Sequence, residues 1–198
     1  MPDEFQLVAG HRALDFANTL DNRYDPIRRV ELLSSYQRFL DFAQQSGAVT
    51  PLQTRRLRGE VDPSGAEKAL AQIVEAREAM HFVFLSVAAG EAPPRDSIDT
   101  LNRYLAEARA QQKLVWGQGR FEWRSPPPVQ SLLSPLHPVL LDAADLLASP
   151  DLRYVRECSA ETCRWLFLDR SKNHSRRWCD MQICGNRAKA QRFHSRQS

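Results

Sequence analysis

All four cysteines of this 198-residue chain lie near its C-terminal end, in two pairs with the same internal spacing. Each pair encloses four residues, and fifteen residues separate the second pair from the first. Two such loops can each offer two thiolates to one tetrahedral ion, and the spacer lets the second loop fold back on the first. We therefore expect a structural zinc ion with four ligands: Cys158, Cys163, Cys179 and Cys184. The simpler interpretations are four unrelated core thiols or two disulfides.

The same pattern bears on whether the metal is catalytic. A catalytic zinc keeps one coordination position for water or substrate, whereas four thiolates fill all four positions. His174 and His194 lie close to the cysteines in the sequence and could replace one of them or guard the site. We interpret both as surface histidines in a basic segment. The pattern thus indicates a structural centre and argues against an enzyme.

The segment that holds the second cysteine pair is strongly basic. Residues 171–198 carry seven Lys or Arg residues against a single acidic residue, Asp180, which is a net charge of +6. The run after Cys184 has good helix propensity and places three basic residues on one face, at spacings i, i+3 and i+7: Lys189, Arg192 and Arg196. Two other residues of this run are expected to face the metal core: Ala190 and Phe193.

The rest of the chain has the opposite charge. The overall net charge is +3, with +6 in residues 151–198 and −3 in residues 1–150. This asymmetry points to a polyanionic partner for the C-terminal end, for which we expect DNA. No stretch approaches the length of a membrane span, and the first residues lack the pattern of a secretion signal. A cytoplasmic protein follows, and reducing conditions there favour zinc thiolates over disulfides.

Two stretches carry a resemblance to known families. The sequence from Phe167 to Met181 and the sequence Cys184-Gly185-Asn186-Arg187-Ala188-Lys189-Ala190 resemble the CGNR zinc finger. The resemblance spans about forty residues and implies that the four cysteines are its zinc ligands; His174 is a mild departure that leaves the ligands unchanged. More loosely, Gly10 to Leu20 (GHRALDFANTL) resembles the ABATE domain that usually precedes this finger. Proteins of this two-part kind are regarded as bacterial stress-induced transcription regulators.

The remaining sequence predicts mainly helices. Hydrophobic residues at helical spacing, with caps and stops, predict helices over about 13–20, 31–46, 51–59, 65–89, 96–111 and 136–147. Residues 5–8 could form a short strand, and residues 152–155 and 165–168 could form short strands around the first cysteine pair. Alternating residues on either side of a glycine-rich turn predict a β-hairpin over 113–124. We therefore expect a mainly α fold with a small β-hairpin: a helical domain over 1–149 and a zinc-finger module over 150–198.

The helical domain offers little chemistry of its own. It has no glycine-rich phosphate loop and no nucleophile motif. A polar cluster near its start could line a pocket for an unidentified small-molecule ligand, in keeping with a sensing role: His11, Asp15, Asn18 and Arg23. The simpler interpretation is that these residues cap helices and form surface pairs.

Three functional classes remain. The first is a DNA-binding regulator in which six residues reach phosphates or bases: Arg176, Arg177, Asn186, Arg187, Lys189 and Arg192. The second is a zinc-stapled RNA-binding or protein-interaction module, in which Trp165 and Trp178 form exposed platforms. The third, a metalloenzyme, is disfavoured by the filled coordination sphere. The basic face could also be a solvated helix surface, and the sequence leaves open a homo-oligomer.

Overall fold

One long helix, α4 (Pro63–Ala89), forms the axis of the helical part of the molecule. It begins where the Asp62 side chain accepts a hydrogen bond from the Gly65 N–H at 2.9 Å, with Pro63 in the first turn. It ends at Gly90, whose φ of 73° is the left-handed conformation that glycine adopts most easily. The computed structural model describes residues 4–59, 61–124 and 131–194, with side chains up to residue 190.

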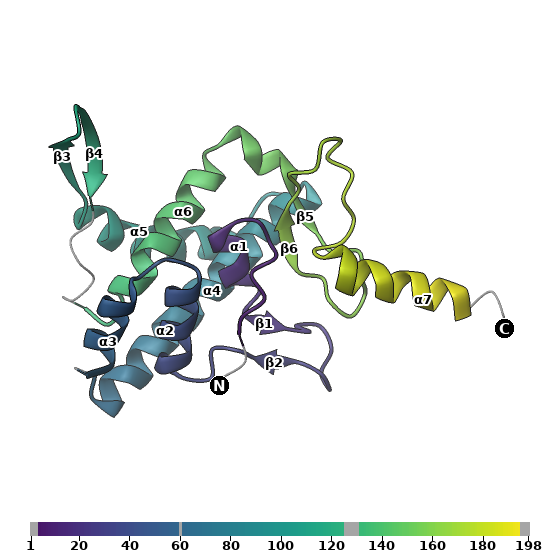
Figure 1. The fold of residues 1–198 in the computed structure, drawn as a ribbon, viewed down its shortest axis with the longest axis horizontal. Helices are drawn as coiled ribbons and strands as arrows, with labels where there is room; N and C mark the ends of the chain where they lie inside the picture. The colour runs from purple at the N-terminus through teal and green to yellow at the C-terminus, as the bar shows by residue number, and fades with distance from the viewer. Residues whose placement is uncertain (1–3, 60, 125–130, 195–198) are drawn as a thin grey trace.

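The other helices pack around α4 (Figure 1). Helices α1 (Arg12–Ala17), α2 (Tyr36–Gln45) and α5 (Arg95–Ala110) contact it directly. Helix α6 (His137–Leu147), which follows a 3-10 turn at Ser134–Leu136, packs on α1 and α5, and α3 (Pro51–Gly59) packs on α2. Their shared core includes a cluster of aromatic rings in edge and tilted contacts: Phe5, Phe16, Phe39 and Phe42.

The strands of the described residues form three small antiparallel pairs. The first joins β1 (Leu20–Asp21) to β2 (Val30–Glu31), and the second is the expected hairpin of β3 (Lys113–Gly117) and β4 (Arg120–Arg124). The third joins β5 (Val155–Glu157), which follows a 3-10 turn at Pro150–Tyr154, to β6 (Leu166–Leu168). The described part of the chain ends with a π-helical turn, Met181–Gly185, and helix α7 (Asn186–His194). The mainly α fold class is confirmed.

Several predicted boundaries were wrong. Residues 5–8 form no strand, because the Gln45 side-chain amide takes up both the N–H and the C=O of Phe5. Helix α2 begins at Tyr36 and not near residue 31, because Ser35 caps its start and residues 30–31 pair as a strand. Residues 152–154 lie in a 3-10 turn, so β5 starts only at Val155. None of the described helices is long and apolar enough to cross a membrane.

Candidate metal centre and its support

The four cysteines come from two separate backbone turns. Cys158 directly follows β5, and Cys163 ends the turn that leads into β6. Cys179 follows a loop of about ten residues after β6, and Cys184 lies in the π-helical turn before α7. Both turns are closed by the backbone: the N–H of Cys163 donates to the Ala160 C=O at 2.9 Å, and the N–H of Gly185 donates to the Asp180 C=O at 3.0 Å.

The four thiols have the geometry of one tetrahedral site. All four cysteines are buried, and their Sγ atoms lie within 4.8 Å of one another. The Sγ of Cys179 is 3.5 Å from that of Cys163 and 3.7 Å from that of Cys184. A zinc ion with four Zn–S bonds of about 2.3 Å requires sulfur–sulfur edges of about 3.8 Å, so the donor set fits zinc. Bound there, zinc fixes the two turns to each other.

The ionisation of these thiols explains why they need a cation. Hydrogen bonds from Cys163 and Cys179 lower the pKa of the Cys158 thiol well below its ordinary value. The same contact with Cys158 raises the pKa of both Cys163 and Cys179 above the ordinary value, and burial raises that of Cys184. The thiol that ionises first therefore opposes ionisation of its neighbours. Four thiolates at this spacing require a positive ion between them.

A buried carboxylate shapes the loop between the two turns. Asp169 is 0% exposed and accepts hydrogen bonds from the N–H groups of Ser171 and Arg176, both at 2.9 Å. Burial raises the pKa of Asp169, but these hydrogen bonds outweigh it and hold the pKa below its ordinary value. His174 is not among the clustered donors: its ring stacks on Tyr154 with 3.7 Å between ring centroids. His194 lies beyond the described side chains.

The residues expected to contact nucleic acid divide into two groups. Arg176 turns into the finger, where its guanidinium donates to the C=O groups of Trp178 and Cys179. The Asn186 amide donates to the Gln182 C=O at 2.8 Å. These two side chains therefore have structural partners within the finger.

Other residues that were expected to contact nucleic acid face outward. Arg177 and Lys189 are exposed, with the Arg177 guanidinium over the ring of Trp178. Arg187 is also exposed, and its Nη1 donates to the Thr162 hydroxyl at 3.1 Å, which joins the second turn to the first. The side chains of Arg192 and Phe193, and all of Arg196, lie outside the described part. Ala190 is exposed, so the expectation that it faces the metal core was wrong, because α7 projects from the body (Figure 1).

The first half of the finger is bound to the helical domain through Asn18. The Asn18 side chain, in a residue only 4% exposed, donates to the Leu166 C=O at 2.8 Å and accepts from the Leu166 N–H at 2.9 Å. Next to it, the N–H of Leu168 donates to the Ala9 C=O at 2.8 Å. Strand β6 thus docks on the segment that resembles the ABATE domain.

Two side-chain contacts extend this docking surface. The Trp165 indole Nε1 donates to Asp21 at 3.0 Å, and the Arg164 guanidinium lies 4.0 Å from the centre of the Tyr24 ring. Sequence reasoning missed these contacts because the partners are more than a hundred residues apart. The available signal was Asn18 within GHRALDFANTL, for which the sequence allowed either a pocket or a capping and pairing role.

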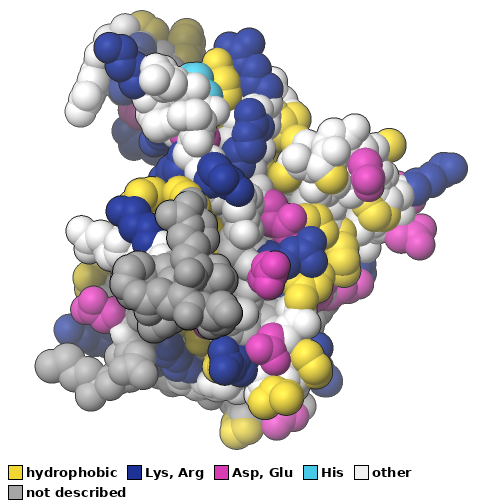
Figure 2. Space-filling model, turned by 90° about the vertical axis from the view of Figure 1, so that its right-hand side faces the viewer, with side chains coloured by type: hydrophobic (Ala, Val, Ile, Leu, Met, Phe, Trp, Pro, Cys, Tyr) yellow, Lys and Arg dark blue, Asp and Glu magenta, His cyan; other side chains and the backbone are white. Residues whose placement is uncertain are grey.

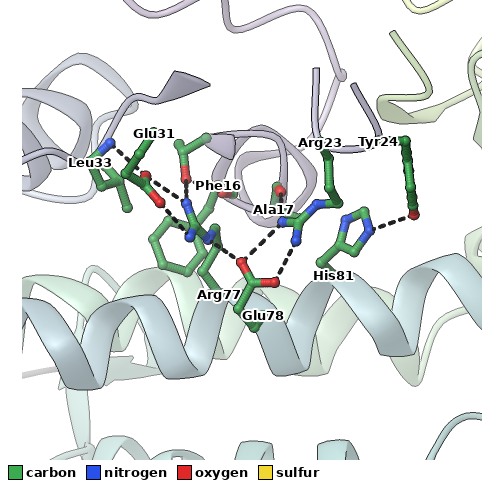
Figure 3. Close-up of polar contacts among 10 residues, drawn as sticks. Phe16, Ala17, Arg23, Tyr24, Glu31, Leu33, Arg77, Glu78 and His81 are labelled. Carbon is green, nitrogen blue, oxygen red and sulfur yellow. Dashed lines mark hydrogen bonds and ion pairs between the residues drawn. The ribbon is translucent and has the colours of Figure 1, made fainter. Parts of the chain in front are cut away.

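A buried ionic network on α4 holds β2 and the β1–β2 connection, which carries Arg23 and Tyr24 (Figure 3). Arg77 is almost fully buried and donates to both carboxylate oxygens of Glu31 in β2, each at 2.7 Å. Glu78 pairs with Arg77 and with Arg23.

His81 completes this network, with its Nε2 at 3.3 Å from the Tyr24 hydroxyl. Burial, and after it the nearby Arg23, lowers the pKa of His81 to about 3, so the ring stays neutral. The network therefore fixes the platform that receives the finger.

The predicted N-terminal polar cluster does not come together as one group. His11 and Asp15 line an open pocket of about 420 Å³, whose other charged residues are Arg12, Asp142 and Arg170. Asn18 turns to Leu166 and Arg23 turns to Glu78, so neither lines this pocket. Burial raises the pKa of Asp15 to about 6, although the Ala9 N–H donates to its carboxylate at 2.9 Å. His11 caps the start of α1.

The comparisons with known families agree with this architecture. No curated protein matches the sequence. Residues 154–197 match the CGNR zinc finger, which together with the four clustered cysteines identifies a zinc-binding module. Residues 10–150, well over half of the chain, match the ABATE family, described as "Putative stress-induced transcription regulator". The chain therefore belongs to the ABATE family of regulators and carries a CGNR zinc finger after the ABATE region.

Proposed function

We propose that this protein is a zinc-dependent DNA-binding transcription regulator whose finger contacts DNA through α7 and the basic loop before Cys179. The observation that carries the proposal is the position of α7. This helix follows directly from the turn that holds Cys184, projects from the body, and contains basic but no acidic residues (Figure 1). Zinc thus fixes the base of a cationic helix that is free to approach a polyanion.

The loop between β6 and Cys179 adds positive charge beside this helix. Arg170, Lys172 and Arg177 are all exposed there. Figure 2 looks at the end of the molecule that carries the finger and shows Lys and Arg side chains gathered on its upper part. We assign phosphate contacts to these residues and to Lys189, and we remove Arg176 from the contact set because its guanidinium is used inside the finger.

The RNA-binding alternative finds less support. It relied on Trp165 and Trp178 as exposed stacking platforms. Trp165 is buried and donates to Asp21, and Trp178 is half-buried beside Arg177. The buried Trp165 ring is not available for base stacking, and the Arg177 guanidinium lies over the ring of Trp178.

A second part of the proposal concerns a small-molecule ligand that would control the regulator. The pocket of His11 and Asp15 also contains Arg12 from α1 and Arg170 from the finger, so a ligand bound there would contact both parts of the chain. Arg12 already pairs with Asp142 at 2.9 Å, so Arg170 is the cation that would bind the carboxylate of a small molecule in this pocket. Thermal shift with a panel of small carboxylates tests this, and the expected stabilisation should be lost in Arg170→Ala.

DNA binding is tested through its salt dependence. Zinc-loaded protein should bind duplex DNA with a log–log salt slope of about −0.9 for each phosphate neutralised. Lys172→Ala and Lys189→Ala should each flatten that slope by about one unit, whereas Lys68→Ala on the exposed side of α4 should leave it unchanged. Equal effects of all three variants would contradict the assigned surface. Site selection from random duplexes, with Cys184→Ser protein as the control, tests whether the contact is sequence-specific.

A further inference from the structure

The β3–β4 hairpin stands clear of the helical body, at the opposite end from α7 (Figure 1). Its two-residue turn places Gln118 and Gly119 at φ of 51° and 78°, as a tight hairpin turn requires. Among the described elements, each of these strands makes extensive contact only with the other. A two-stranded hairpin by itself is marginally stable in water and is normally covered by another layer.

One face of this hairpin is entirely apolar. The strand register pairs Leu114 with Trp123 and Trp116 with Phe121, which puts all four side chains on the same face. The Trp116 and Phe121 rings meet edge to face with 4.9 Å between centroids. All four side chains are nonetheless exposed: 53% for Leu114, 65% for Trp116, 66% for Phe121 and 63% for Trp123. A contiguous apolar patch of this kind marks a contact surface.

The opposite face carries the charges of the hairpin. By the alternation of the strands, Lys113, Arg120, Glu122 and Arg124 point away from the aromatic face, and Arg124 pairs with Glu122 at 3.0 Å. A single-stranded nucleic acid needs cations beside the stacking rings, and here the cations lie on the other side. A membrane surface accepts such a face with the cations among the headgroups, and the experiment below separates vesicle binding from self-association. The separation of charge from apolar surface argues against stacking on a nucleic acid and favours an apolar surface as the partner.

We propose that the aromatic face of the β3–β4 hairpin binds the same face of a second copy of this chain. The face is self-complementary, as a two-fold interface requires, and face-to-face packing leaves both charged faces in water. Helix α7 lies at the far end of the molecule, so both basic helices stay exposed in such a dimer (Figure 1). The proposal is independent of DNA binding, because it is tested without DNA.

The size of the face sets the strength of the dimer. Aromatic side chains offer about 150–250 Å² each, so three that are about two-thirds exposed, together with Leu114, present roughly 400–500 Å². Two copies then bury roughly 800–1,000 Å², below the ~1,200–2,000 Å² of a standard stable interface. We therefore expect a weak, reversible dimer that dissociates on dilution.

Sedimentation equilibrium on the full-length zinc-loaded protein, from low to several hundred micromolar, measures this association. The wild-type mass should rise from monomer to dimer with concentration. Trp116→Thr combined with Phe121→Thr keeps residues that suit a strand but removes the aromatic centre, and should raise the dissociation constant at least about tenfold. Circular dichroism melting of each variant shows that it remains folded.

Two matched controls locate the interface. Lys113→Thr combined with Arg124→Thr changes a facing pair on the charged side of the hairpin, and Phe82→Thr removes an exposed aromatic ring from α4. Both proteins should dimerise like the wild type. A wild type that stays monomeric throughout overturns the proposal, including the case in which the hairpin binds vesicles or single-stranded DNA instead. A dimer that survives the Trp116→Thr and Phe121→Thr changes also overturns it.

Discussion

The two cysteine pairs have the same spacing but very different surroundings. The first pair encloses the turn between β5 and β6, whose apolar side chains lie in the core shared with α1 and α4. The second pair adjoins the π-helical turn and α7, where most of the described side chains are exposed. One half of the finger is therefore part of the helical body, whereas the other half projects from it (Figure 1).

This difference indicates two separate sources of stability. The first half is held by buried apolar side chains and by the hydrogen bonds of Asn18 and Ala9 to β6. The second half has little core of its own and depends on the metal. The division of the chain at residues 149 and 150 remains a prediction, and we propose that β5 and β6 fold with the helical domain. The element that is placed chiefly by zinc, with the Arg187–Thr162 hydrogen bond beside it, is then the one proposed to touch DNA.

Loss of zinc should have the largest effect. Apparent zinc binding energies of about 10–16 kcal/mol in finger peptides are large enough to supply the folding of the second half. In Cys184→Ser, or after strong chelation, hydrogen exchange should show lost protection from the loop after β6 through α7. Protection of β5, β6 and the helices should persist. Cys163→Ser, in the first pair, should give the same pattern because it also removes the metal. Unfolding of the whole chain in either variant would show that the two halves do not have separate sources of stability.

Asn18→Ala should weaken the support of the first half. It leaves the buried N–H and C=O of Leu166 without partners, at a cost of roughly 2–4 kcal/mol in the free energy of unfolding. Denaturant titration of the zinc-loaded protein measures the change. Asn102→Ala on the exposed side of α5 is the matched control and should lie within about 0.5 kcal/mol of the wild type. An equally small effect at Asn18 would mean that β6 is held by apolar contacts alone.

The stability that the docking of β6 provides should depend on pH through Asp15. Its carboxylate accepts a hydrogen bond from the N–H of Ala9, and the C=O of Ala9 accepts one from the N–H of Leu168 in β6. Burial raises the pKa of Asp15 to about 6. A raised carboxyl pKa favours the protonated folded state, so its stabilising contribution is complete below about pH 4 and is lost as pH rises through about 6. Asp15→Asn should therefore show a flatter stability profile from pH 5 to 7.

The size of this change in stability follows from how far burial raises the pKa of Asp15. The variant should gain about 1–1.5 kcal/mol relative to the wild type from pH 5 to pH 7, which is about half of the total effect of this pKa difference. Denaturant midpoints at each pH, with zinc retention checked alongside, measure it. Asp99→Asn on α5, whose side chain is 66% exposed, should keep the wild-type profile. Parallel profiles for wild type and Asp15→Asn would show that this carboxylate is not the titrating group.

The sequence predicted features that depend on local spacing. The helix start at Thr50 and the stop at Gly90 follow from capping residues and backbone preference, and the metal pattern follows from four residues within one segment. The β3–β4 hairpin followed from its turn and its alternation. Each of these signals lies within a short stretch of chain, so tertiary packing did not need to be known.

Features that depend on distant partners could not be predicted. Asn18 and Leu166 are separated by 148 residues, so nothing in the sequence distinguishes a docking amide from a pocket amide. In the sequence, nothing distinguishes Arg176 from its exposed neighbour Arg177. In the structure, Asp169 accepts a hydrogen bond from the Arg176 N–H, and the Arg176 guanidinium donates to backbone carbonyl groups. Glu31 and Arg77 were both missed because their pairing requires α4 and β2 to be adjacent.

Asn186→Ala should have the smallest effect and should decide how the second half contacts DNA. The amide is exposed and donates to the Gln182 C=O, so its loss should cost only about 0.5–1.5 kcal/mol, with zinc retained. Because that bond directs the amide toward its own turn, we expect preference for a selected DNA site to be unchanged. Arg187→Ala is the informative partner: its guanidinium is exposed beside the metal turn, so base reading there should cost about 1–3 kcal/mol of discrimination. Competition between selected and random duplexes measures both; loss of preference in Asn186→Ala, with melting and zinc content intact, would restore Asn186 as a base-reading residue.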